Sequence, residues 1–87
     1  MTRIETDPEA LVAMGRELKR ASSSIEEAIR KVRSTLNATK WNDPVRRELE
    51  QNLEAIARMA KQIDNVSNDS QRMLNRKAGE LRTYLGR

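Results

Sequence analysis

The chain has 87 residues, of which 37% are hydrophobic and 34% charged, and its net charge is +4. This length fits one small domain, and no apolar run approaches the roughly 20 residues of a membrane-spanning helix. There is no cysteine and no histidine, which removes the thiol nucleophile, the commonest general base and the usual zinc ligands. The three glycines, Gly15, Gly79 and Gly86, stand far apart, so no glycine-rich phosphate loop is present. We therefore expect a protein that is not an enzyme and that binds neither a cofactor nor a metal ion.

The first predicted helix covers residues 8–39 and follows a short lead, residues 1–6, that we expect to be disordered. That lead has no apolar core of the kind found in cleavable signal peptides. Asp7 is a good N-cap, and Pro8 suits the first helical position, where its missing N–H is not needed. Apolar residues then recur at three- and four-residue spacing, which is typical of a helix with one apolar face. Ser22, Ser23 and Ser24 do not shift this pattern, and we expect them to allow a neighbouring segment to approach closely.

A turn over residues 40–43 separates this helix from a second one, predicted over 44–85. Asp43 precedes Pro44 and so leaves the α region, which makes it the N-cap of the second helix. The apolar spacing continues to Val66 and then crosses a run, 65–70, that is rich in residues competing for backbone hydrogen bonds. A kink there is possible on the sequence alone. Gly86 stands where a helix would stop.

Two such helices predict an all-α fold, an antiparallel two-helix hairpin that dimerises into a four-helix bundle. Each helix would be on the order of 50–60 Å long, and a single hairpin of that length cannot hide its apolar stripe. The partner is either a second copy or another helical hairpin, and the sequence leaves both open. We expect the partner interface to contain Leu11, Met14, Leu18, Ile25, Val32, Leu49, Leu53, Ile56, Ile63 and Val66.

The turn holds the only tryptophan, in the triplet Trp41, Asn42 and Asp43. A lone tryptophan in a short turn near mid-chain, between two long amphipathic helices, resembles the Trp-x-Gly (WXG) helical hairpins of type VII (ESX) secretion, the early-secreted-antigen family. Asp43 occupies the position of the family's glycine. The resemblance implies a non-enzymatic hairpin that is cytoplasmic before export and is secreted without a cleavable signal peptide. It also implies pairing with a second hairpin or with the helical N-terminal domain of a secreted effector.

Two aromatic residues are candidates for recognition under this resemblance. Trp41 either covers the end of the helix pair or, as in the family, forms part of a surface that the secretion ATPase reads. The family's C-terminal export element is a tyrosine followed four positions later by an acidic residue. Tyr84 matches the tyrosine, but no acidic residue follows it, so the element is incomplete. On the residues alone, we interpret Tyr84 as the end of the apolar stripe.

A basic segment near the C-terminus supports an alternative function. Arg72, Arg76, Lys77, Arg82 and Arg87 accompany a single acidic residue there, Glu80. Cations near a helix C-terminus are favoured by the helix dipole and need no ligand, although a basic helical bundle could also bind nucleic acid or another polyanion. No aromatic residues interleave with these cations, so we rank this alternative below partner binding. A third hypothesis is a helical scaffold with no partner beyond itself.

Overall fold

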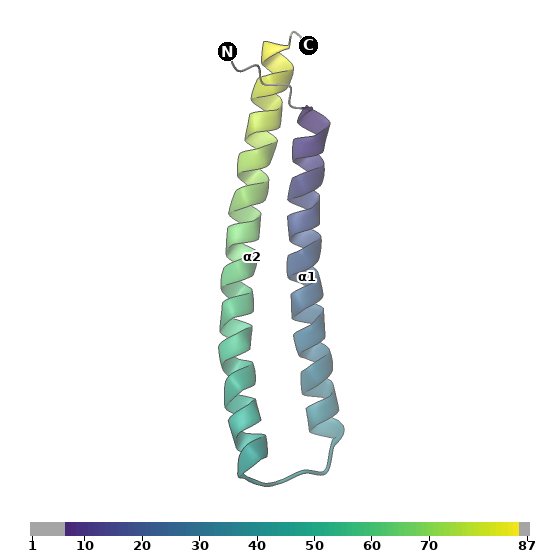
Figure 1. The fold of residues 1–87 in the computed structure, drawn as a ribbon, viewed down its shortest axis with the longest axis vertical. Coiled ribbons are helices and arrows are strands. Elements are labelled where there is room, and N and C mark those ends of the chain that lie inside the picture. Colours follow the sequence, from purple (N-terminus) through teal and green to yellow (C-terminus); the bar gives the residue numbers. More distant parts are fainter. Residues whose placement is uncertain (1–6, 86–87) are drawn as a thin grey trace.

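The computed structural model describes residues 7–85 and shows an antiparallel hairpin of two long helices, α1 (Pro8–Ala38) and α2 (Pro44–Tyr84). The molecule is a rod of 64 × 21 × 18 Å, with the turn at one end and the start of α1 and the end of α2 toward the other (Figure 1). The predicted all-α hairpin is therefore confirmed. Because α2 has 41 residues and α1 has 31, the last turns of α2 extend past the start of α1 (Figure 1).

Both helices begin as the two Asp-Pro pairs predict. The Asp7 carboxylate accepts the Glu9 amide at 3.0 Å, and the Asp43 carboxylate accepts the Val45 amide at 2.9 Å and the Arg46 amide at 3.2 Å. A proline follows each cap in the first helical turn. The side chains of the two caps thus replace hydrogen bonds that the first turn of a helix lacks.

Each helix ends one residue before the predicted bound. Thr39 has extended backbone, and its N–H donates to Leu36 as the C-cap of α1, so residues 40–43 are reached in a non-helical conformation. Leu85 caps α2 after Tyr84. Differences of one residue are expected where a helix frays into its cap. The predictions for residues 1–6 and for Gly86 lie outside the described residues.

The polar run at 65–70 remains α-helical throughout. Ser67 in this run is buried against α1, and Asn68 and Ser70 are half-buried. Packing against a neighbouring helix commonly overrides weak intrinsic helix propensity. The run therefore supplies small side chains to the contact between the helices, without a break.

Small residues dominate the contact between α1 and α2, which we call the interhelix seam. The Cβ that an alanine would place at Gly15 lies 3.0 Å from Gln71 Cγ and 3.4 Å from Gln71 Cα, so the two backbones approach closely there. Ser22 is fully enclosed, and its hydroxyl donates to Asp64 at 3.0 Å. The buried residues of the seam are Leu11, Gly15, Ser22, Leu36, Leu53, Ala60, Ser67 and Ala78.

Candidate partner-binding face

Large apolar side chains remain in solvent along most of the hairpin. Val66 is 62% exposed and Met73 is 59% exposed, values typical of surface residues rather than of a core. We call the set the apolar face; it consists of Met14, Leu18, Ile25 and Val32 from α1 and Val45, Ile56, Met59, Ile63, Val66 and Met73 from α2. A row of exposed apolar residues of this length is typical of surfaces that bind another molecule.

The two helices place these residues on the same side of the hairpin. Residues at the centre of the seam recur every seven positions, as Gly15, Ser22, Ile29 and Leu36 on α1 and Leu53, Ala60, Ser67 and Leu74 on α2. Apart from Val45, the residues of the apolar face lie either just before a seam residue, as Met14 and Met59 do, or three positions after one, as Ile25 and Ile63 do. Because the helices are antiparallel, an equal step from the seam on each turns toward the same side of the pair. The exposed residues therefore form one continuous surface.

Most of the predicted interface residues belong to this surface. Met14, Leu18, Ile25, Val32, Ile56, Ile63 and Val66 are exposed, and Leu49 is half-buried beside them. Leu11 and Leu53 instead lie buried within the interhelix seam of a single hairpin. A helical stripe wide enough to pack against two neighbours contains both kinds of position, and periodicity alone does not separate them. The list also omitted Met59 and Met73, which each lie just before a seam residue, and Val45 in the first turn of α2.

The opposite side of the hairpin carries the ion pairs between the helices. Lys19 Nζ lies 2.7 Å from Asp64 Oδ1, and Arg82 of α2 lies 2.8 Å from Glu9 of α1. The residues just before the seam positions are mainly apolar, whereas those just after are polar, for example Arg16, Arg30, Glu54 and Lys61. One side of the hairpin thus carries charged residues and the ion pairs between the helices, and the other side carries exposed apolar residues.

Asp64 is the central acceptor on the charged side. It accepts hydrogen bonds from Lys19 and from Ser22, and these two donors, in that order, hold the pKa of its carboxyl below the usual value of 3.8. The side chains of Lys19 and Asp64 are each about a quarter to a third exposed, so solvent screens their attraction. The pair fixes the register of α1 against α2 more than it adds stability.

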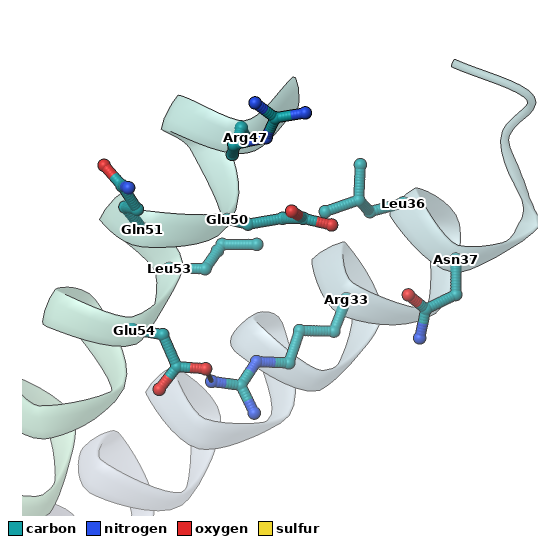
Figure 2. Close-up of a pocket in the computed structure, with 8 residues that line it drawn as sticks. All are labelled: Arg33, Leu36, Asn37, Arg47, Glu50, Gln51, Leu53 and Glu54. Carbon is teal, nitrogen blue, oxygen red and sulfur yellow. Dashed lines mark ion pairs between the residues drawn. The ribbon is translucent and has the colours of Figure 1, made fainter. Parts of the chain in front are cut away.

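Near the turn, the charged side has a shallow depression of about 440 Å³ (Figure 2). Arg33 from α1 points across it toward Glu54 of α2, with 3.6 Å between their charged atoms. The walls of the depression carry both signs of charge, and they also include Arg47, Glu50 and Gln51. Paired charges of both signs do not favour one class of ligand, so this depression does not define a binding site.

The turn is held by Arg46, a residue that the sequence pattern did not single out. Its guanidinium donates to the carbonyl oxygens of Thr39, at 3.1 Å, and Trp41, at 2.8 Å, and its Nε lies 3.2 Å from Glu50. Asp43 lies beside this network: the Trp41 side chain first, and then hydrogen bonds from the Arg46 and Val45 amides, lower the pKa of its carboxyl. Asp43 thus caps α2 next to the tryptophan of the turn.

Trp41 is half-buried and lines a second depression, of about 420 Å³, at the turn end of the apolar face. Val32 and Thr35 from α1 and Leu49 from α2 form its other apolar walls, together with the stem of Lys31. The depression continues the apolar face up to the tryptophan ring. Trp41 therefore covers part of the helix ends and also presents a surface that an apolar side chain of a partner could contact. Asn42 is exposed beside it.

Tyr84 occupies the overhanging end of α2 and is 85% exposed. It therefore stands at the end of the apolar stripe, as interpreted from the sequence, but contributes little to packing within the hairpin. The last described turns of α2 also hold basic residues that contact acids: Arg72 pairs with Asp69, and Lys77 lies 3.9 Å from Glu80.

Across residues 7–85, no group of three or more acidic side chains is arranged to hold a metal ion. Neither helix, over the same residues, contains a segment long and apolar enough to cross a membrane. No model of a known protein family matches the chain, and comparisons with characterised proteins and with solved structures found no match. The structure itself shows a small helical hairpin with an exposed apolar face suited to binding a partner.

Proposed function

We propose that this chain is a non-enzymatic partner-binding hairpin that completes a four-helix bundle through its apolar face. The observation that carries the proposal is the gathering of exposed apolar residues from both helices on one side, with the ion pairs between the helices on the other. Helical hairpins that leave one face apolar commonly bury it against a second hairpin at a small crossing angle. The partner is a second hairpin or the helical N-terminal domain of a larger protein.

The thin interhelix seam supports this proposal. Its buried apolar residues are three leucines and two alanines, and small side chains recover little hydrophobic free energy. Two helices with one such contact are at best marginally stable, because a chain of this size buries a limited fraction of its surface. Most of the apolar surface that could still be removed from water belongs to the ten exposed large residues of the apolar face. Only a partner can cover this surface.

We further propose that the hairpin serves a type VII (ESX)-like secretion system, in the manner of the Trp-x-Gly family. The support is the resemblance of the Trp41 turn together with its position, since Trp41 ends the apolar face where a partner would reach it. In this proposal the chain is cytoplasmic before export and leaves as a folded pair, without a cleaved signal peptide. Trp41 contributes to a surface shared between the hairpin and its partner.

Export from a bacterium that carries a type VII system tests this function. The chain should accumulate in the medium of the intact strain with the mass of the intracellular chain, and it should be absent from the medium of a strain lacking the secretion ATPase. Val66→Asp, on the apolar face, should abolish export, whereas Asn75→Asp, on the charged side, should not. Trp41→Ala should reduce export while partner binding persists. Release that does not require the ATPase would contradict the type VII assignment.

Polyanion binding is the competing function, and no contact in the structure favours it. Arg72, Lys77 and Arg82 each lie within ion-pair distance of an acidic residue, so their charge is partly neutralised within the hairpin. Retention of the chain on DNA that falls steeply with added salt would support this function over ours.

A further inference from the structure

We propose that the occupant of the apolar face is a second copy of this chain rather than an acidic partner of different sequence. This inference rests on the proposed function, which leaves the partner open, and it is drawn from where the charges lie. The chain is basic, and its net charge of +4 would favour an acidic partner if the positive charge bordered the apolar face. The distribution of charge shows that it does not.

The border of the apolar face carries a balanced set of charges. Residues two positions after a seam residue lie along its outer edge, and two charged residues, Lys77 and Glu80, lie on the face itself near the open end. The charged members of this border are Glu17, Lys31, Glu48, Asp69, Arg76, Lys77 and Glu80. Four are acidic and three are basic, so the border carries −1. Residues 7–85 carry +3 (15 Lys and Arg against 12 Asp and Glu), so the described residues away from the face carry +4.

Several of these border charges already have partners on their own helix. Glu17 pairs with Arg20 at 2.8 Å, Asp69 pairs with Arg72, and Lys77 lies 3.9 Å from Glu80. A balanced and internally paired border neither repels a second copy nor attracts an acidic surface. The positive excess lies on the opposite side, where two hairpins packed through their apolar faces keep it apart.

The size of the face also suits self-association. It extends from Met14 to Val32 on α1 and from Val45 to Met73 on α2, and the hairpin is 21 Å across. At 1.5 Å per residue the face is about 30–40 Å long, a footprint on the order of 700–800 Å². A stable specific interface buries roughly 800 Å² on each partner. Two copies that cover each other along this face therefore reach the size of an ordinary dimer interface.

Sedimentation equilibrium of the purified full chain tests the inference. We expect a dimer whose dissociation constant changes by less than about threefold between 50 and 500 mM sodium chloride, because the contact is apolar and its border is balanced. Val66→Asp should weaken the dimer by about 100-fold or more, since each dimer would bury two carboxylates. Asn75→Asp introduces the same charge on the opposite side and should leave the dimer unchanged. Circular dichroism at high protein concentration verifies that the variants remain helical.

If Val66→Asp fails to fold, Ile63→Ala replaces it, and we expect this variant to weaken the dimer by at least about tenfold with helicity retained. A chain that stays monomeric at every concentration would overturn the second copy as occupant, as would a dimer that persists in both face variants. A monomeric chain that is still exported through the secretion ATPase would leave the proposed function intact with a different partner. A dimer that is never exported would refute the type VII role and leave the inference standing.

Discussion

The two glycines inside the helices provide a matched pair of substitutions that probes the interhelix seam. Alanine at a helix interior is favoured over glycine by roughly 0.5–1 kcal/mol. At Gly79 a new Cβ meets no atom within 4 Å, so Gly79→Ala should gain this amount, which is about 2–8 °C in melting temperature for a chain of this size. At Gly15 the new Cβ lies 3.0 Å from Gln71 Cγ and 3.4 Å from Gln71 Cα. The first contact is too close and must open by a few tenths of an ångström, whereas the second is near ordinary van der Waals distance.

Overpacking of this kind costs about 1–3 kcal/mol, which exceeds the gain in helix propensity. Gly15→Ala should therefore lower the free energy of unfolding by about 1 kcal/mol, and the two alanine variants should differ by about 1.5–2 kcal/mol. The assay is urea unfolding followed by circular dichroism at 222 nm, with all three proteins at one concentration so that association contributes equally. Equal stabilisation by both substitutions would show that the helices do not approach closely at Gly15, and it would refute the seam described above.

Three further substitutions test the seam, its charged side and the turn. Leu53→Ala removes a buried side chain and should lower the free energy of unfolding by about 2–4 kcal/mol, measured by the same urea assay. Because folding lowers the pKa of Asp64, this carboxylate stabilises the hairpin above about pH 4, and the stabilisation is lost as the pH falls through the folded pKa. Between pH 6 and pH 2, the melting temperature of Asp64→Asn should therefore drop less than that of the parent chain. An equal drop in both proteins would exclude Asp64 as a source of acid sensitivity. Arg46→Ala releases the carbonyls of Thr39 and Trp41, so the emission of the single tryptophan should shift to longer wavelength while helicity is retained, and an unchanged spectrum would show that Arg46 does not hold the turn.

The sequence was sufficient to predict the hairpin because its helix boundaries are local features. Asp7 and Asp43, each before a proline, set where the helices start, and the caps act within two or three residues of the chain. The polar run at 65–70 illustrates the limit of local reasoning. Its weak helix propensity leaves a kink possible, and only the packing of Ser67 against α1 explains why the helix continues.

The division of each apolar stripe between seam and face was not predictable from the sequence. Leu11 and Leu53 have the same spacing as their exposed neighbours, and their burial depends on the register of α1 against α2. That register is fixed by contacts between distant residues, such as Lys19 with Asp64 and Gly15 with Gln71, and a single-helix pattern contains no record of such pairs. Arg46 was missed for a similar reason, because its partners are backbone carbonyls that only the folded turn brings within reach.

The central claim is that the apolar face is covered by a second chain in the stable protein. Thermal unfolding of the purified chain over a thousandfold range of protein concentration tests this claim most directly, because a folded state that requires association melts higher as the concentration rises. We predict a melting temperature that increases steadily with concentration for the parent chain and for Asn75→Asp, and one that is lower at every concentration for Val66→Asp. A parent chain that melts cooperatively at one temperature across the whole range, as a single copy, would contradict the account.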